Sequence, residues 1–351
     1  MARSPRSRRR GALAGTVLAA AVLLCASSPA AVGVTVTPKS VCTITDQGLR
    51  ELSGLAADGE NWYAVNDGGN RIDIFVLDRA CSVRRVLTAP IDPYDVEDLA
   101  RSADGTLWLA DTGDNRLRRD TVALHKVTRD GHATLYRLTY PDGPHDAEAL
   151  LLDRSGVPHV VTKHALGQSE IYRPASALRS PGPTPLEKVG EVTISPTTTT
   201  GGPVGGTGTV LVTGGAVSAD GTVIALRTYT DVYLYSAPDG DVLAALRRDP
   251  VRAALPNEDQ GEAIAFEPDG TLLSAGEGVD QKVRAISGAA DLVAHAPHTT
   301  LPRPDGATGE GDGDHSGPTN DADSPAMPVL AVALMAATAL LLVLGKRLRR
   351  R

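Results

Sequence analysis

The segment Tyr94–Arg116, with the sequence YDVEDLARSADGTLWLADTGDNR, contains the pattern that decides the fold. Two acids, Asp95 and Glu97, precede a short apolar run, and a turn around Asp104-Gly105 leads into a second apolar run that ends in further acids. Two apolar runs joined by a glycine-containing turn are typical of a β-hairpin. The segment therefore predicts a hairpin that carries carboxylates at the end opposite its turn.

Weaker copies of this hairpin recur along the chain, five in all, from about residue 47 to residue 286. Their turns lie at Asp58-Gly59, Asp104-Gly105, Ser155-Gly156, Asp220-Gly221 and Asp269-Gly270. In four copies an acid or a hydroxyl lies eight residues before the turn glycine, at Glu97, Glu148, Thr213 and Glu262. The first copy is two residues shorter and has Ser53 at this position. One or two further strand-like runs follow most of the hairpins.

Four short strands repeated at this spacing are typical of one blade of a β-propeller. Because each blade buries its faces only against its neighbours, the repeat implies a closed ring. We expect an all-β propeller with six blades, favoured over five or seven, in which residues 35–46 and the residues after Glu277 form the sixth blade. The segment Pro174–Gly208, rich in Pro, Gly and Thr, is predicted to be an extended loop between the third and fourth blades.

Residues 1–30 have the pattern of a secretory signal peptide. Five Arg occur in the first ten residues, an apolar run extends from Gly11 to Leu24, and small residues follow. This order predicts export and cleavage after Ala30. The alternatives are an uncleaved signal anchor, which the short apolar run disfavours, and a lipidated Cys25, which the bulky residue before it disfavours.

The other end of the chain predicts a membrane anchor. Residues 326–345 are uncharged and mostly apolar, enough for one bilayer crossing, and residues 346–351 are basic. Because basic residues stay on the cytoplasmic side, we expect a single-pass type I protein whose propeller, residues 31–294, is extracellular. Residues 295–325 are acidic and rich in Gly and Pro, as expected of a disordered stalk. The composition resembles that of proteins from high-GC actinobacteria.

Composition and cysteine content limit the remaining possibilities. The chain has 351 residues and a net charge of −7, without the basic face of a nucleic-acid binder. With Cys25 in the signal peptide, two cysteines remain, Cys42 and Cys81. An even number in an exported chain predicts one disulfide, the alternative being two buried free thiols.

Acidic residues recur at the hairpin ends that should form one rim of the ring. The first strands begin near Glu97, Glu148 and Glu262, and the second strands end near Asp67, Asp111, Asp114 and Glu277. Carboxylate oxygens are the ligands that Ca²⁺ prefers, so these seven residues are candidate metal ligands. The alternative is structural, because an acid at a repeated position can also brace one blade against the next through backbone N–H groups.

Two basic residues, Lys163 and Arg227, occupy the corresponding rim position in the third and fourth copies. They are candidate ligands for phosphate or another anion, or they balance the carboxylates. The nucleophile elbow G-x-S-x-G, the zinc motif H-E-x-x-H and the Walker A loop are absent from the sequence. No catalytic residue can therefore be assigned.

The repeat motifs resemble those of the phytase-like propellers, a group described as having esterase-like activity of phytase. The resemblance rests on Glu51-Leu52-Ser53-Gly54-Leu55, on D-x-E-D-L-A from Asp95 to Ala100, and on G-E-A-I-A from Gly261 to Ala265. It covers about residues 47–286 and implies six blades, a tendency to bind Ca²⁺ and phosphoester hydrolysis. The dense basic phosphate site of propeller phytases is not matched, since Lys163 and Arg227 are the only basic residues at rim positions.

We therefore expect a membrane-anchored, cell-surface propeller that binds a ligand or a protein partner at an acidic rim with the help of Ca²⁺. One alternative is a Ca²⁺-dependent phosphoesterase, and another is a structural envelope protein whose carboxylates only brace the blades. The sequence favours a role without catalysis and identifies neither the ligand nor the partner.

Overall fold

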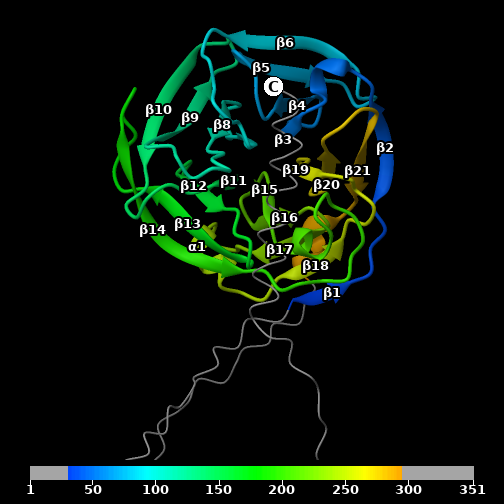
Figure 1. Ribbon diagram of the computed structural model, residues 1–351. Helices are drawn as coiled ribbons and strands as arrows, with labels where there is room; N and C mark the ends of the chain where they lie inside the picture. Colours follow the sequence, from blue (N-terminus) through cyan, green and yellow to red (C-terminus); the bar gives the residue numbers. More distant parts are fainter. Residues whose placement is uncertain (1–30, 295–351) are drawn as a thin grey trace, which may run out of the picture.

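Each copy of the repeated hairpin forms the two inner strands of a four-stranded antiparallel sheet. The computed structural model describes residues 31–294, and its sheets are arranged as blades around a central axis (Figure 1). Blade 1 consists of β3 (Leu52–Ala57), β4 (Trp62–Asn66), β5 (Ile72–Leu77) and β6 (Val83–Ala89). Blade 2 consists of β7 (Asp98–Arg101), β8 (Leu107–Asp111), β9 (Val122–Val127) and β10 (Ala133–Thr139).

The next blades repeat this order of strands from the axis outward. Blade 3 consists of β11 (Ala147–Leu152), β12 (Pro158–Thr162), β13 (Gln168–Pro174) and β14 (Thr184–Thr193). Blade 4 consists of β15 (Val212–Val217), β16 (Val223–Thr228), β17 (Asp231–Ser236) and β18 (Val251–Ala254), and β1 (Val32–Val34) pairs with β18 in parallel. Blade 5 consists of β19 (Gly261–Phe266), β20 (Leu272–Gly276), β21 (Gln281–Ile286) and β2 (Lys39–Ile44).

Residues 31–294 also contain four short helical segments outside the strands. They are η1 (Gln47–Leu49), η2 (Gly205–Thr209), α1 (Val242–Leu246) and α2 (Ala289–Ala294). The helix α1 begins at Asp241, whose carboxylate accepts hydrogen bonds from the N–H groups of Leu243 and Ala244 at 2.9 and 3.0 Å. Such an acceptor satisfies N–H groups that a helix of this length leaves without a partner.

The ring closes through the N-terminal strand. The inner strands β3, β7, β11, β15 and β19 contact one another in a circle, and β2 pairs antiparallel with β21. The predicted closure by both ends of the propeller is therefore present, but it completes the fifth blade, and the described residues form five blades where the sequence favoured six. The reason is that the residues after Glu277 supply only one strand, β21, before α2 begins.

The segment Pro174–Gly208 differs from its prediction as a loop. It contains β14, which pairs antiparallel with β13 from Leu186 to Thr193 and in parallel with β10 at Thr184 and Pro185. This parallel pairing joins the outer edges of blades 2 and 3 into one sheet. Because β14 carries many polar residues and has one solvent-facing side, its sequence lacks the apolar run expected of a strand.

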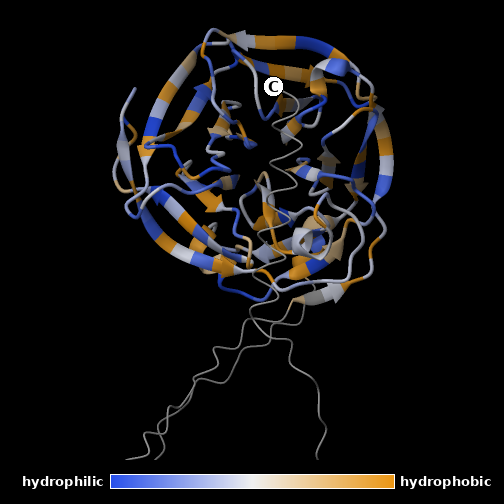
Figure 2. Ribbon diagram, viewed as in Figure 1, coloured by the Kyte–Doolittle hydropathy of each residue, from blue (hydrophilic) through white to orange (hydrophobic). Residues whose placement is uncertain are grey.

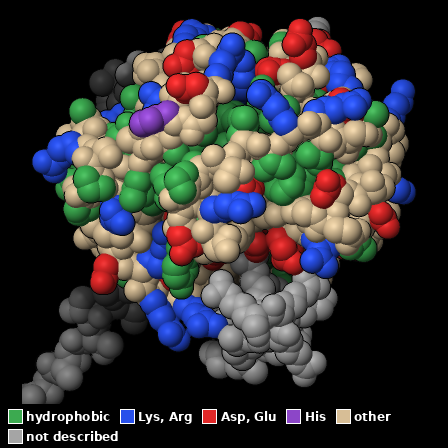
Figure 3. Space-filling view, turned by 90° about the horizontal axis from the view of Figure 1, so that it is seen from above, with side chains coloured by type: hydrophobic (Ala, Val, Ile, Leu, Met, Phe, Trp, Pro, Cys, Tyr) green, Lys and Arg blue, Asp and Glu red, His purple; other side chains and the backbone are tan. Residues whose placement is uncertain are grey.

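Apolar side chains fill the spaces between neighbouring blades. Each of the five hydrophobic clusters in residues 31–294 contains residues of two adjacent blades. Figure 2 shows hydrophobic and hydrophilic residues in bands along the outer strands β2, β6 and β14. The edge of the ring over blade 1 mixes acidic and basic side chains (Figure 3). This mixture agrees with the absence of a basic face in the sequence.

The predicted disulfide is confirmed. Cys42 of β2 and Cys81 in the turn between β5 and β6 are bonded, with a Cα–Cα distance of 5.8 Å. The bond links the strand that closes blade 5 to blade 1, so it crosses the junction where the two ends of the ring meet.

The predicted signal peptide (1–30), stalk (295–325), membrane helix (326–345) and basic tail (346–351) lie outside the described residues. Among residues 31–294, no helix has the length and apolar character needed to span a bilayer.

Candidate functional site

The repeated acid or hydroxyl occupies a β-bulge at the start of the inner strand. The register between the inner hairpin strands shifts at Ser53, Glu148, Thr213 and Glu262 in their four blades. A bulge bends the strand and re-aims a side chain next to a site. The bulged residues therefore direct their side chains differently from their neighbours, at the rim where the inner strands begin. We call this opening of the ring the acidic mouth.

Two of the bulged residues brace the blades. The hydroxyl of Ser53 donates to the carbonyl oxygen of Val96 at 2.7 Å, and that of Thr213 donates to the carbonyl oxygen of Gly261 at 2.9 Å. Each bond links one blade to the residue that precedes the repeated acid of the next. The structural reading of the repeat thus holds for the hydroxyls.

The acids at the equivalent positions are buried and converge. Glu97, Glu148 and Glu262 expose 2%, 1% and 1% of their surface. Glu97 and Glu148 form a group with Asp146, in which one carboxylate oxygen of each residue lies within 4.8 Å of the others. We call Glu97, Asp146 and Glu148 the first acidic cluster.

Asp146 is a site residue that the sequence reasoning missed. It lies directly before β11, and one of its carboxylate oxygens accepts a hydrogen bond from the N–H of Asp114 at 2.7 Å. A signal was present, because D-x-E occurs both at Asp95-Val96-Glu97 and at Asp146-Ala147-Glu148. The first acid of this motif lies next to the bulge, and in blade 3 it turns toward the same cluster as the second.

Gly113 allows the close approach of carboxylates to the backbone of the loop after β8. A Cβ atom at this position would lie 2.1 Å from Oε1 of Glu97 and 2.6 Å from Oδ2 of Asp95. Contacts this short do not occur, so any larger residue would displace at least one of these side chains. The glycine of the predicted D-T-G-D-N loop is therefore needed because its lack of a side chain leaves room for these carboxylates, and not because of its backbone conformation.

A lysine and a tyrosine border the first acidic cluster on the side of blade 4. Lys163 forms an ion pair with Glu148, and its ammonium group lies 3.0 Å from the hydroxyl oxygen of Tyr229. Burial raises the pKa of Glu148 even though Lys163 opposes the shift, and the charges of Asp146 and Glu262 add to the increase. Burial lowers the pKa of Lys163, but the charge of the Glu148 carboxylate outweighs this effect. The pKa of Lys163 is therefore raised well above its ordinary value.

Glu262 lies close enough to Glu148 to raise the pKa of that carboxyl. Its Oε1 accepts a hydrogen bond from Nε2 of Gln260 at 2.9 Å. Its Oε2 is buried and has no hydrogen-bond partner among residues 31–294. A buried carboxylate oxygen without a donor is costly, so this atom marks a place where a cation or a ligand donor would be stabilising.

A second group of acids lies between blades 5 and 1. One carboxylate oxygen each of Glu51, Asp67 and Glu277 lies within 4.8 Å of the others, and we call these residues the second acidic cluster. Asp67 and Glu277 were predicted as ligands from the sequence, whereas Glu51 was not. The two clusters are built by different pairs of blades on the same rim.

Asp111 and Asp114 are occupied by protein donors. The carboxylate of Asp111 accepts hydrogen bonds from the N–H groups of Tyr94 and Asp95 at 3.1 and 3.0 Å and pairs with Arg119 and His125 at 2.9 and 3.1 Å. Burial alone would raise the pKa of Asp111. The hydrogen bond with His125 and the charge of Arg119 outweigh burial and lower this pKa to about 2. Asp114 accepts the N–H groups of the two arginines at 118 and 119. Both acids stabilise their loop, and neither belongs to an acidic cluster.

Arg227 is fully buried, contrary to its predicted position at the rim. Its guanidinium group pairs with Glu258 at 2.8 Å and donates to the carbonyl oxygen of Ala263 and the hydroxyl of Ser274 at 3.1 and 3.0 Å. The side chain runs from blade 4 into blade 5 and binds the two together. These contacts support a bracing role for Arg227. Lys163, whose side chain is 7% exposed against 0% for Arg227, is the basic residue paired with the first acidic cluster.

A third group of possible metal ligands surrounds a tyrosine hydroxyl. Asp142, His145 and Glu170 lie within 4.8 Å of one another, but the hydroxyl oxygen of Tyr172 is 2.8, 3.0 and 2.9 Å from them. The tyrosine oxygen therefore occupies the centre on which these side chains converge. Hydrogen bonding explains this group without a metal.

Asp98 is a buried acid that belongs to none of these groups. It is completely buried on β7, and its Oδ2 accepts hydrogen bonds from the N–H groups of Leu150 in β11 and Gly215 in β15 at 2.7 and 3.1 Å. Burial raises the pKa of Asp98 to about 8. The side chain thus joins three blades across the axis.

The chain has only distant likenesses to known proteins. No family model matches the chain, and no curated protein matches it. Among solved structures, it is similar to a luciferin-regenerating enzyme, with a TM-score of 0.41, 11% identity, and coverage of 68% of this chain and 78% of that one. It is also similar to a gluconolactonase from Xanthomonas campestris, with a TM-score of 0.38, 14% identity, and coverage of 67% and 72%.

A third similar structure is virginiamycin B lyase from Staphylococcus aureus, with a TM-score of 0.35, 12% identity, and coverage of 69% of this chain and 72% of that one. At these scores the likenesses carry no inference about activity. The resemblance of the repeat motifs to phytase-like propellers gains no support from them. The assignment as a propeller rests on the closed ring of blades itself.

Proposed function

We propose that this protein is a cell-surface propeller that binds Ca²⁺ at the first acidic cluster and, through the ion, an anionic ligand or a protein partner. The observation that carries the proposal is the convergence of Glu97, Asp146 and Glu148 within 4.8 Å in a buried mouth. Ca²⁺ binds oxygen ligands at about 2.3–2.6 Å, so oxygens that share one ion lie within about 5 Å of each other. The three carboxylates fit this requirement.

The neighbours of the cluster support a cation with an open side. The buried Oε2 of Glu262 adds an oxygen without a donor close to Glu148. Lys163 places an ammonium group beside the same carboxylate, where it would contact an anion held by the ion. The second acidic cluster has a similar donor set and is a further candidate for Ca²⁺.

The cellular location is part of the proposal and rests on the ends of the chain. Residues 1–30 would direct export, residues 326–345 would anchor the protein, and residues 295–325 would hold the propeller away from the bilayer. An extracellular location is consistent with the disulfide between Cys42 and Cys81, because such bonds persist in oxidising compartments.

A Ca²⁺-dependent phosphoesterase is the second candidate. The observation in its favour is Lys163 next to the acidic cluster, since a cation and an ammonium group together stabilise a phosphoryl group. The bracing role of Arg227 removes the other basic residue from this mouth. We therefore place binding ahead of hydrolysis.

The test is thermal unfolding of the full-length chain in detergent, with millimolar Ca²⁺ and with chelator. We expect Ca²⁺ to raise Tm by several degrees, because an ion that binds only the folded state at 100 times its Kd adds about 2.7 kcal/mol. Glu97→Gln should abolish most of this rise. Glu191→Gln, which changes an exposed carboxylate on β14, should leave it unchanged.

The same samples distinguish the candidates. The phosphoesterase would be favoured if the protein released phosphate from a phosphomonoester, if this release required Ca²⁺, and if the variant Lys163→Met lost it. A Ca²⁺-dependent rise in Tm without hydrolysis would favour binding. No change in Tm at millimolar Ca²⁺ would leave the acids as braces, as in the structural alternative.

A further inference from the structure

A cavity of about 650 Å³ opens at the end of the axis opposite the acidic mouth. It lies where the inner hairpins turn, and residues of all five blades line it. We call this opening the hairpin mouth. Its volume falls within the range of about 300–1,000 Å³ that is usual for small-molecule sites. Neither the repeated acids nor Lys163 lines it, so it is separate from the site described above.

Small residues border the cavity near the ends of the inner strands. Four blades have alanine at the same register, namely Ala56, Ala100, Ala216 and Ala265, and all four alanines line the cavity. Blade 3 has Leu151 at this register, which packs between blades 3 and 4 and does not line the cavity. Asp98, which joins β7 to β11 and β15, does not line it either.

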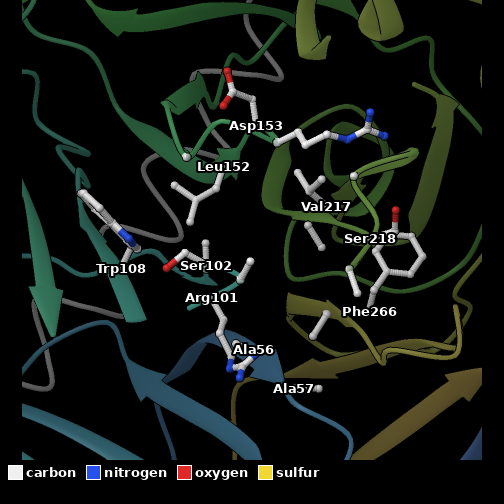
Figure 4. Close-up of a pocket in the computed structure, with 18 of the residues that line it drawn as sticks. Ala56, Ala57, Arg101, Ser102, Trp108, Leu152, Asp153, Val217, Ser218 and Phe266 are labelled. Carbon is white, nitrogen blue, oxygen red and sulfur yellow. The ribbon is translucent and has the colours of Figure 1, made fainter. Parts of the chain in front are cut away.

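The walls offer apolar and aromatic surface to a ligand. Trp108, Leu152, Val217 and Phe266 line the cavity, and Figure 4 shows these side chains around one space. The ring of Trp108 stacks on Tyr136 with a centroid distance of 6.0 Å, which holds the indole in place. Lys126 lies 5.4 Å from the indole centroid. A flat or aliphatic body would contact such walls favourably.

Charged side chains at the hairpin mouth are of two kinds. Three aspartates accept hydrogen bonds from residues of their own turns. Asp104 accepts from Ser102 and Thr106, and Asp153 accepts from Ser155 and Val157. Asp220 accepts from Ser218 and Thr222. The hydrogen bond from Ser102 lowers the pKa of Asp104 to about 2. Arg154 in turn donates to the carbonyl oxygen of Asp220 at 3.0 Å. These groups are engaged in the turns.

Arg101 and Lys126 are the exceptions among the charged residues of the lining. Within residues 31–294, neither takes part in an ion pair or donates a hydrogen bond, although Arg101 lies near enough to Asp58 to affect its pKa. Both side chains are half-buried in the wall of the cavity, and the guanidinium group of Arg101 lies beside Ala56 in Figure 4. Their N–H donors are therefore available to a bound acceptor. Guanidinium groups bind carboxylates with two parallel hydrogen bonds.

We propose that the hairpin mouth is a second ligand site, which binds a small amphiphilic anion: a carboxylate on a compact aromatic or aliphatic body. Arg101 pairs with the carboxylate, and Trp108 with the apolar walls contacts the body. We expect binding at this site to be independent of Ca²⁺, because no residue of either acidic cluster lines the cavity. The proposal does not depend on the function proposed above.

The test is isothermal titration calorimetry on the full-length chain in detergent, with 2-naphthoate and with its uncharged analogue 2-naphthylmethanol. We expect saturable binding of 2-naphthoate with 1:1 stoichiometry and at least about tenfold weaker binding of the alcohol, the loss of one charge-assisted pair. Arg101→Leu should weaken the binding of 2-naphthoate by about the same factor and leave the affinity for the alcohol unchanged. Arg129→Leu, in the neighbouring groove outside the cavity, is the matched control and should have no effect.

A second variant tests the cavity without touching charge. Ala100 and Ala216 line the cavity and are partly exposed, so Ala100→Leu/Ala216→Leu places larger side chains next to it. Binding of both compounds should weaken as the cavity narrows, in a variant whose urea unfolding shows that it is folded. The proposal would be overturned by equal affinities for the acid and the alcohol, by an unchanged affinity in Arg101→Leu, or by the absence of saturable binding to the native chain.

Discussion

The two mouths of the ring are built from the same inner strands and differ in what the sequence places at each strand end. At the acidic mouth, four of the five inner strands begin with a bulge, and the bulged side chains are polar. At the hairpin mouth, four of the five inner strands have alanine as their second-last residue, and these alanines border a cavity. The repeat thus supplies equivalent positions at both ends of the inner strands. Polar residues at one end and alanines at the other make one mouth acidic and the other apolar.

The comparison also separates polar groups that brace the ring from those that are offered to a ligand. Asp98, Asp111 and Arg227 are buried and fully engaged with protein partners. Glu262 has an oxygen without a partner in the described part of the chain, and Arg101 makes no ion pair there. Burial alone therefore does not distinguish the two roles, whereas the count of donors and acceptors around each group does.

The largest effect is expected from Asp98, which links three blades across the axis. Asp98→Ala would leave the buried N–H groups of Leu150 and Gly215 without acceptors, and we expect a loss of about 3 kcal/mol in the free energy of unfolding. Asp98→Asn keeps an acceptor oxygen of the same size and should lose much less. Denaturation by urea, monitored by fluorescence, measures both. Equal stability of Asp98→Ala and the native chain would refute the role of Asp98 as a link across the axis.

A smaller effect is expected from a brace at the acidic mouth. The pKa of Asp111 is lowered from its ordinary value near 4 to about 2, so its ionised form stabilises the fold by about 2 kcal/mol above pH 4, and this contribution is lost as pH falls through 2. Asp111→Asn should lower stability at neutral pH by that amount and flatten the acid limb of the stability profile. The measurement is chemical denaturation between pH 2 and pH 7.

Asp114→Asn serves as the comparison for Asp111, since Asp114 accepts backbone N–H groups of the same loop without an ion pair. It should lower stability at neutral pH less than Asp111→Asn does. An Asp111→Asn protein that retains the native acid limb would show that the pairing with Arg119 and His125 does not stabilise the fold.

The smallest effect is expected from a methyl group placed at the acidic mouth. Gly113→Ala would push Oε1 of Glu97 away from its present position, and we expect about a tenfold weaker Kd for Ca²⁺. Gly113 does not adopt a left-handed conformation, so stability in chelator should change little. Calorimetric titration with Ca²⁺ gives the affinity, and the binding of 2-naphthoate at the other mouth should be unchanged. An unchanged affinity for Ca²⁺ would remove Glu97 from the ion site.

Much of the architecture was predictable because it depends on local patterns. The turns, the alternation of apolar runs, and the even number of cysteines after the predicted signal peptide predict the hairpins, the ring and the disulfide. The blade number was wrong, because whether β2 adds to blade 5 or begins another blade depends on long-range pairing. The strand β14 was missed, because its half-exposed sequence resembles a polar loop.

From the sequence we could predict on which rim of the ring the candidate site lies, but not which side chains meet there. Acids at equivalent strand ends must lie on one side of the ring, and the structure brings together Glu97 with Glu148, and Asp67 with Glu277. The sequence does not show which partners each side chain reaches. Arg227 turns into the next blade, Asp111 is enclosed by donors, and Asp146 joins the cluster from a connecting segment. The hairpin mouth was not foreseen, because alanines in a strand are read as core.

The most direct test of the account is to locate Ca²⁺ by anomalous diffraction from crystals of the protein grown in millimolar Ca²⁺. The account predicts a peak at the acidic mouth within about 2.6 Å of carboxylate oxygens of Glu97, Asp146 and Glu148, and none at the hairpin mouth. Ordered crystals without a peak at the first acidic cluster, or with Lys163 filling it as the partner of all three acids, would contradict the central claim.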